Sequence, residues 1–511
     1  MLVSHKILIY IKRYWLIILL TLIGAFLRLY NIKPTISFMG DQGRDVRIVR
    51  DLLTKADPIL VGPTTSVGKI QLGPLYYYYM VPWLWLFNFD PVGTAVGVAF
   101  LGIISIPLLF FITKSMFNVN VASIASILYT FAVVVIQNTR SSWNPNPMPL
   151  LAILLIYSLY QVYVKSSNKH IILSILWFAV ALQMHYMILL ISPLILFILA
   201  FSYYKSINKT ATLKSLLWGS LLFLLFLTPL IIFDIRHDFI NTKGLLEFFQ
   251  KGHHSPVAWY QPILDSEGRV QTSFGDILGL DKWRNIRNPL ALILFISSVS
   301  YGFVKRNNKT VQIIVLYSLF GIVGMSIYKG DLFNHYLGFF FPIPFLTIGI
   351  LLAKIAEKGK ILGKLFVALS IIWLIVLQVK QYSIFKPLGW QINDIQNVAS
   401  DISTDAGSQT YNILLLDDTK DYRSMNYRYF LESMPTPPVN ELNFSGVNTL
   451  YLISQYQDIG KLDLHVWELE TFIGQEVDNL QRPEDTAIIT DKISKQWHYD
   501  GGPWIYKIVR S

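Results

Sequence analysis

The sequence predicts an all-α polytopic membrane protein of about 11–13 transmembrane helices, followed by a small extracytoplasmic α/β domain at the C-terminus. Of its 511 residues, 53% are hydrophobic and only 15% are charged, whereas about a quarter of a soluble domain is charged. Apolar runs long enough to cross a bilayer recur up to about residue 380. These observations exclude a disordered chain and an ordinary soluble enzyme. The chain has no Cys, so disulfides and zinc–thiolate sites are excluded as well.

Charge divides the chain into two domains, which we place at 1–382 and 383–511. The second range carries 10 Lys/Arg and 18 Asp/Glu, whereas the first carries 33 and 14. We interpret the basic excess as cytoplasmic loop charge in contact with the bilayer. Because the soluble domain has no basic patch, nucleic acid is not an expected partner.

The first domain is expected to cross the membrane about eleven times. Basic loops mark the cytoplasmic side, which places the N-terminus inside and the C-terminal domain outside. The first external loop is then 31–90. Within it, PLYYYYMVPWLWLF at 74–87 is expected to be an interfacial helix, because its aromatic residues suit the membrane surface. The expected spans are 15–29, 91–113, 120–137, 147–164, 171–184, 187–203, 215–233, 289–304, 311–328, 336–353 and 361–379.

The C-terminal domain alternates short polar and apolar runs. Residues 412–416, 449–453 and 504–509 are predicted as strands, and 423–432 as a helix. The domain has neither a glycine-rich phosphate loop nor metal-ligand spacing. A lid, a substrate platform and a docking module all fit this pattern.

The segment GDQGRDVR in the first external loop is the first candidate for chemistry. Asp41 and Asp45 are four residues apart and share one face of a helix, with Arg44 beside them. One interpretation is a helix cap with a surface ion pair. The other is a catalytic carboxylate that Arg44 keeps ionised while it accepts a proton from a substrate.

The remaining candidates gather at the predicted external ends of the spans. Ionisable groups at such depths are costly and often functional. Structural interpretations of these residues stay open. The segment 61–74 around Lys69 could be a plain connector, Arg140 could simply lie at a helix end, and His185 could be a buried structural histidine. The proposed substrate-binding residues are Arg44, Lys69, Tyr76, Tyr77, Arg140, Trp143, Asn144, His185, Arg236, His237, His335 and Tyr336. No two histidines have the helical spacing of a zinc site, so no metal site is assigned.

The Asp41 motif, the stretch LGPLYYYY, the external Arg140 loop and the apolar spacing resemble the class C integral-membrane glycosyltransferases. The resemblance is to bacterial relatives of protein O-mannosyltransferases and of the lipid A aminoarabinose transferase, over about the first 380 residues. It implies a bacterial plasma-membrane enzyme that uses a polyprenyl-phosphate-linked sugar donor and inverts the anomeric centre. The acceptor would be an extracytoplasmic glycan, lipid or protein.

The resemblance also assigns roles to residues. Asp41 occupies the position of the base. Better-known relatives have Asp-Glu there, whereas this chain has Gln42 after Asp41, so Asp45 is the candidate second acid. Asn144 stands where relatives often carry an acidic residue. No organic cofactor is implied, and a divalent cation is left open.

Two other functions remain as alternatives. A lipid or sugar transporter or flippase would be expected to show internal repeats and polar breaks at mid-membrane, and neither is evident. An oligosaccharide polymerase or ligase would use the same membrane face, with 234–288 as its external loop.

Overall fold

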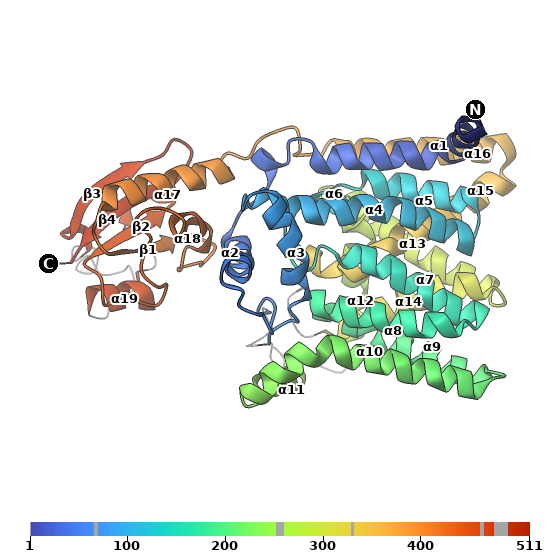
Figure 1. The fold of residues 1–511 in the computed structure, drawn as a ribbon. Helices are drawn as coiled ribbons and strands as arrows, with labels where there is room; N and C mark the ends of the chain where they lie inside the picture. The colour runs from blue at the N-terminus through green and yellow to red at the C-terminus, as the bar shows by residue number, and fades with distance from the viewer. Residues whose placement is uncertain are drawn as a thin grey trace. The chain divides into compact units, whose positions relative to one another are not determined.

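The computed structural model describes residues 2–65, 70–251, 260–328, 332–459, 464–474 and 489–510 (Figure 1). The chain forms two compact units. The helical unit comprises Met1–Tyr30, Asp57–Leu86 and Gly93–Tyr382, and the mixed unit comprises Asn31–Ala56, Phe87–Val92 and Ser383–Ser511. The sequence-based division placed the whole first loop with the membrane part. In the structure, 31–56 and 87–92 instead belong to the unit of the C-terminal residues.

The helical unit is built from long, mostly parallel or antiparallel helices (Figure 1). Its α-helices are α1 (Leu2–Leu29), α3 (Leu75–Leu86), α4 (Val92–Met116), α5 (Val119–Phe131), α6 (Val133–Asn138), α7 (Met148–Lys165), α8 (Asn168–Met184), α9 (Ser192–Lys205), α10 (Lys209–Arg236), α11 (Ile240–Lys251), α12 (Gln261–Val270), α13 (Arg284–Val304), α14 (Lys309–Ile327), α15 (Pro342–Lys358) and α16 (Lys360–Val379). Short helical segments are η2 (Tyr186–Ile191), η3 (Gln271–Asp276) and η4 (Asn334–Phe339).

Every predicted span overlaps one or two helical segments of this unit; 120–137 is divided between α5 and α6, and 187–203 and 336–353 begin in η2 and η4. Within the described ranges, seven helices are long and apolar enough to cross a membrane, and α5 and α8 are shorter apolar helices. The predicted fold class, a helical multi-pass membrane protein with a small C-terminal sheet, is therefore confirmed.

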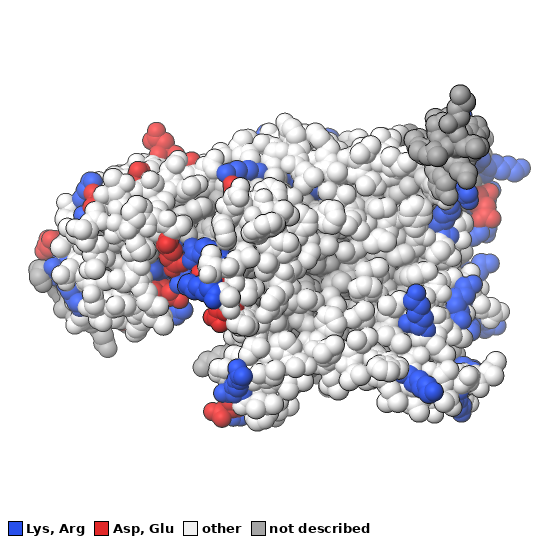
Figure 2. Space-filling view, viewed as in Figure 1, with Lys and Arg blue, Asp and Glu red and all other residues white. Residues whose placement is uncertain are grey.

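Lys and Arg side chains gather at one end of the helical unit, at the right of Figure 2. Three helices begin there with the same device, an Asn cap. The side chains of Asn118, Asn208 and Asn308 accept hydrogen bonds from free N–H groups in the first turns of α5, α10 and α14. These caps satisfy donors that the helices cannot pair themselves. Each of these helices begins within a few residues of the end of the preceding helix, α4, α9 or α13.

Helix α3 runs crosswise to α4 and α8 (Figure 1). Its 12 residues extend about 18 Å, so α3 alone is too short to cross a hydrocarbon core of about 30 Å. Tyr76 and Tyr77 are buried within the unit, whereas Tyr78 and Trp85 are exposed. This two-sided character agrees with the expected interfacial helix.

The mixed unit has a four-stranded sheet in the order β1-β2-β4-β3. Strands β1 (Tyr411–Leu416) and β2 (Thr449–Ser454) are parallel and fully buried, and β4 (Trp504–Val509) is antiparallel to both β2 and β3 (Ile493–His498). The other elements are η1 (Lys33–Thr35), α2 (Gly40–Lys55), α17 (Ile392–Ala406), α18 (Met425–Leu431) and α19 (Trp467–Ile473).

The three predicted strands and the predicted helix of this domain are present. The sequence analysis missed β3, because ISKQWH at 493–498 is polar and mostly exposed, as suits an edge strand. It also missed α17, whose buried residues recur with the 3.6-residue period of a helix.

The arrangement of charged loops predicts the membrane orientation. A reporter fused after residue 390 should register as extracytoplasmic and one at Lys360 as cytoplasmic, because basic loops remain inside. Paired alkaline phosphatase and green fluorescent protein fusions would measure this in cells. Both positions reporting the same side would contradict the orientation.

Candidate functional site

The N-terminal turn of α2 holds the predicted carboxylates. Arg44 donates from Nη1 to Asp41 Oδ1 at 2.8 Å, and from Nε and Nη2 to Asp45 Oδ1 at 3.0 and 2.8 Å. The Asp41 side chain is 47% exposed, whereas that of Asp45 is 1% exposed. One guanidinium therefore joins an accessible carboxylate to a buried one. Asp41 is not the helix cap, because α2 starts at Gly40 with Met39 as its N-cap residue.

Asp421 is a third carboxylate near this turn, and the sequence analysis missed it. Its Oδ2 accepts a hydrogen bond from the backbone N–H of Met425 at 2.9 Å. Burial and, to a lesser extent, the charges of Asp417 and Asp41 raise the pKa of Asp421 to about 6, although the Met425 N–H and Arg44 act in the opposite direction. No local motif surrounds Asp421, so only the fold identifies it.

The two glycines of GDQGRD allow this close approach. A Cβ on Gly40 would overlap the Asp421 carboxylate, and one on Gly43 would overlap the backbone of Met425 and Asn426. The amide of Asn426 donates to Phe38 O at 3.3 Å, just before α2. The glycines therefore fix the contact between the first turn of α2 and the start of α18.

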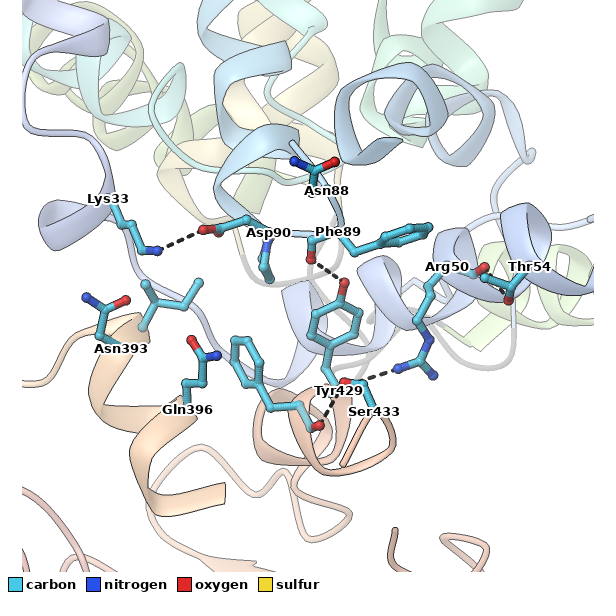
Figure 3. A pocket seen from close by; sticks show the side chains of 13 residues that line it. Lys33, Arg50, Thr54, Asn88, Phe89, Asp90, Asn393, Gln396, Tyr429 and Ser433 are labelled. Atoms are coloured by element: carbon cyan, nitrogen blue, oxygen red, sulfur yellow. Dashed lines mark hydrogen bonds and ion pairs between the residues drawn. The ribbon is translucent and has the colours of Figure 1, made fainter. Parts of the chain in front are cut away.

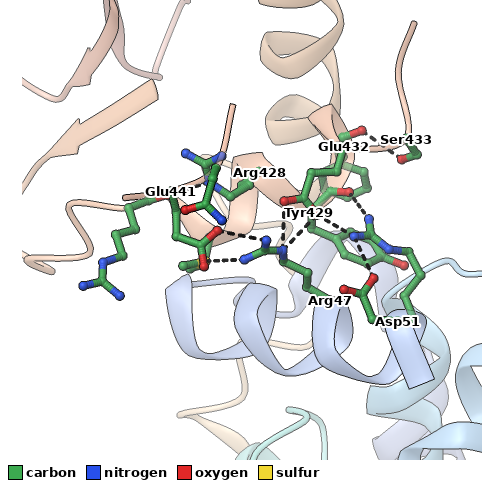
Figure 4. A network of polar contacts seen from close by, with 12 residues as sticks. Arg47, Asp51, Arg428, Tyr429, Glu432, Ser433 and Glu441 are labelled. Atoms are coloured by element: carbon green, nitrogen blue, oxygen red, sulfur yellow. Dashed lines mark hydrogen bonds and ion pairs between the residues drawn. The ribbon is translucent and has the colours of Figure 1, made fainter. Parts of the chain in front are cut away.

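Ion pairs continue the same contact along α2 (Figure 4). Arg47 binds Glu432 at 2.8 Å and Glu441 at 2.9 Å, and Arg50 binds Glu432 at 2.5 Å. Burial alone would lower the pKa of Arg47, but its hydrogen bonds to Glu441 and the charge of Glu432 outweigh burial and raise it. Arg50 also donates to Tyr429 O at 3.0 Å and stacks over the Tyr429 ring. This network holds α2, and with it Asp41, in one orientation.

The helical unit brings together four predicted residues from three separate loops, at the end opposite its basic loops. The rings of Trp143 and His335 lie 4.1 Å apart, and His185 lies 4.6 Å from Tyr336. Tyr186 joins this aromatic cluster through a 2.8 Å hydroxyl contact with Tyr328. The cluster combines aromatic rings and hydroxyl groups; His185 and Tyr336 are buried, and Trp143 and His335 are half-buried.

His185 is neutral in this environment. Burial lowers its pKa to about 3, with a further contribution from His335. Its Nδ1 accepts the N–H of Met187 at 3.3 Å. It can therefore serve as a hydrogen-bonding group or packing surface, but it carries no charge for a phosphate at neutral pH.

Arg140 and Asn144 hold helix ends together. Arg140 donates to Leu27 O at 3.1 Å and Tyr30 O at 3.0 Å, at the C-terminal end of α1, where cations are favourable. Asn144 donates to Met184 O at 2.7 Å, at the end of α8. Burial lowers the pKa of Arg140 to about 10, with a contribution from Arg28. Both side chains have a structural task whatever else they do.

The other predicted residues are spread over the helical unit. Tyr76 shares a 2.9 Å hydroxyl contact with Ser142, and Tyr77 is buried beside it in α3. Arg236 and His237 are exposed at the end of α10, where His237 stacks on Phe233 at 4.1 Å. Their neighbour Asp234 is buried and accepts N–H groups of Asn241 and Thr242, which caps α11. Lys69 lies outside the described residues.

A metal centre is not evident in the described part of the chain. No group of three or more His, Asp and Glu side chains there could hold an ion. Asp41 and Asp45 are instead both paired with Arg44.

Comparisons with known proteins show which proteins this chain resembles. Residues 72–233 match the family described as dolichyl-phosphate-mannose-protein mannosyltransferase. ArnT from Cupriavidus metallidurans in the apo state is similar with a TM-score of 0.60 and 10% identity, over 97% of this chain and 98% of that chain. The chain has the fold of the class C membrane glycosyltransferases. The predicted resemblance is confirmed at that level, and the family description agrees with the predicted enzyme class.

Two further structures with the class C fold contain lipid phosphates. ArnT from the same organism bound to undecaprenyl phosphate gives a TM-score of 0.56 at 13% identity, over 98% of this chain and 99% of that one. The archaeal oligosaccharyltransferase AglB from Archaeoglobus fulgidus, with an inhibitory peptide and a dolichol-phosphate, gives 0.53 at 11% identity, over 97% and 74%. No curated protein matches the chain in sequence.

The close approach at Gly43 predicts a stability effect. Gly43→Ala should destabilise the mixed unit by about 1–3 kcal/mol, because the added Cβ overlaps backbone that cannot turn aside. Thermal unfolding of the purified protein measures the change. Gly389→Ala is the matched control in the same unit, since a Cβ there meets nothing within 4 Å. Equal melting temperatures for both variants would contradict the proposed contact.

The raised pKa of Asp421 predicts a pH dependence of stability. Between about pH 4 and 6 the folded state retains a proton that the unfolded state has lost, so stability should fall as pH rises through this range. Asp421→Asn should lack this fall while still accepting the Met425 N–H. Melting temperatures of the two proteins from pH 4 to 7.5 test this. A constant difference between them across the range would show that Asp421 titrates normally.

Proposed function

We propose that this chain transfers a sugar from a polyprenyl-phosphate donor to an extracytoplasmic acceptor, with inversion, at the outer boundary of the bacterial plasma membrane. The observation that carries the proposal is the accessible Asp41 carboxylate, bound by Arg44 at the start of α2 in a chain with the class C fold. The lipid phosphates bound to ArnT and AglB support a donor of this kind.

Exposure distinguishes the two candidate catalytic acids. An acceptor can reach Asp41, whose side chain is about half exposed, but not Asp45, which is buried behind Arg44. We therefore assign Asp41 as the base and Asp45 as the residue that positions Arg44.

The reaction is a single displacement. As the acceptor oxygen or nitrogen attacks the anomeric carbon, its proton passes to Asp41. The bond between that carbon and the phosphate oxygen breaks on the opposite side, and polyprenyl phosphate leaves with the electron pair. Attack opposite the leaving group inverts the anomeric centre. Charge that develops on the phosphate is best stabilised by a preorganised cation.

The candidate cations differ in whether other groups of the protein already bind them. Arg140 bonds two carbonyls of α1, whereas Arg236 is exposed and has no hydrogen bond or ion pair within the described ranges. We assign Arg236 to the donor phosphate on this basis. The Trp143–His335 stack and Tyr336 are assigned to the sugar rings of the substrates.

The alternatives differ in what they require. A transporter or flippase needs no proton acceptor at Asp41. A polymerase or ligase would catalyse the same reaction with an oligosaccharide donor. Activity assays with a single-sugar donor and with an oligosaccharide donor distinguish it from the proposed transferase.

The assignment of the base predicts a stable but nearly inactive variant. Asp41→Asn should lower the rate of sugar transfer about 10²–10⁴-fold, because Asn cannot accept the proton. Its melting temperature should change little, because the side chain is partly exposed and does not cap α2. Sugar transfer from a radiolabelled polyprenyl-phosphate sugar to membrane acceptors measures the rate.

Asp500→Asn is the matched control, because Asp500 is an exposed carboxylate of the same unit, in the turn between β3 and β4. It should transfer sugar at the wild-type rate. Full activity in Asp41→Asn would move the base elsewhere. A large loss of melting temperature would instead indicate a structural role for the Asp41–Arg44 pair.

A further inference from the structure

The mixed unit contains a pocket of about 390 Å³ whose lining includes neither Asp41 nor Asp45. Its lining comes from the C-terminal half of α2, the turn at 88–91, α17 and α18 (Figure 3). Its volume lies in the range of about 300–1,000 Å³ that is usual for small-molecule sites. Arg50 and Thr54 lie about 14–20 Å along α2 from Asp41, so a ligand here would not touch the proposed base.

The charges of this pocket are already neutralised. Lys33 binds Asp90 at 2.8 Å, and Arg50 binds Glu432 at 2.5 Å and Asp51 at 3.4 Å. A phosphate or carboxylate ligand would have to displace these partners. The pocket therefore favours an uncharged ligand over an anionic lipid headgroup or a free phosphate.

Three amide side chains at the pocket are free to bind such a ligand. Asn88, Asn393 and Gln396 line it, and none has a hydrogen-bond partner within the described ranges. Each amide both donates and accepts, which matches the hydroxyl group of a sugar. Asn393 and Gln396 come from the same helix, α17, and are seen on the same side of the Lys33–Asp90 pair (Figure 3).

Aromatic rings and a strained turn complete the lining. Phe89, Tyr429 and Phe430 supply apolar faces for the C–H surface of a sugar ring. Asn88 and Phe89 are consecutive non-glycine residues with positive φ, 50° and 64°. Such backbone is costly and is often found at binding sites. Here Tyr429 stabilises it by donating its hydroxyl to Phe89 O at 2.7 Å.

We propose that this pocket binds a neutral saccharide unit. That the saccharide belongs to the acceptor rests on the proposed function, whereas binding itself does not. The pocket would hold a part of the glycan remote from the reacting group, and so select acceptors by a unit that undergoes no chemistry.

Ligand-observed saturation-transfer NMR on the full-length protein tests this without any donor. The protein is kept in a detergent that has no sugar headgroup. The neutral probes are the trisaccharides of glucose, mannose and N-acetylglucosamine, and the anionic probes are trigalacturonate and methyl phosphate. At least one neutral probe should bind, and neither anionic probe should.

The double substitution Asn393→Ala with Gln396→Ala should raise the Kd of that probe about tenfold, because two hydrogen bonds are lost. Both side chains are exposed, so folding should be unaffected, and the single variants replace the double one if its melting temperature falls. Asn397→Ala is the matched control, since Asn397 is an exposed amide of α17 outside the pocket. It should bind like the wild type.

The outcomes separate the two proposals. The pocket assignment would be overturned if no neutral probe bound, if only the anionic probes bound, or if all variants bound the neutral probe equally. A protein that binds the neutral probe through Asn393 and Gln396 but transfers no sugar would leave the pocket assigned and reject the proposed reaction.

Discussion

The contact between α2 and α18 is the interaction on which the mixed unit depends. Gly40 and Gly43 remove the side chains that would separate the two elements, and Arg47 and Arg50 then reach the carboxylates of Glu432 and Glu441. The accessible carboxylate, Asp41, and the neutral pocket lie at opposite ends of the same helix. Buried ion pairs of this kind add little net stability, but they fix one arrangement among many.

The helical unit has a different requirement, because the unpaired N–H and C=O groups at the ends of its helices need hydrogen-bond partners. At one end, the side chains of Asn118, Asn208 and Asn308 cap α5, α10 and α14. At the other end, Arg140 and Asn144 cap the carbonyl ends of α1 and α8. The polar residues that looked functional in the sequence therefore divide into those that close helices and those, such as Trp143 and His335, whose rings gather in the aromatic cluster.

The sequence was sufficient for the fold class, since long apolar runs and basic loops are strong local signals. It also singled out the motif around Asp41, as well as Trp143, His185, His335 and Tyr336, which lie together in the aromatic cluster. It could not show that Trp143, His185 and His335 converge, because three distant loops supply them. Asp421 carried no signal of its own, and the roles of Gly40 and Gly43 depend on a partner far away in the chain. Exposure, which separates Asp41 from Asp45, is likewise a property of the fold.

The distance in sequence between α2 and its partner has a consequence for biosynthesis. Arg47 and Glu432 are 385 residues apart. At a translation rate of about 5–20 residues per second, α2 emerges roughly 20–80 s before the carboxylates that neutralise it. During that interval α3 to α16 are synthesised, while Arg47 and Arg50 of α2 lack their partners Glu432 and Glu441. The C-terminal residues thus do not form an appendage that matures by itself; their synthesis completes a structure that was begun at residue 31.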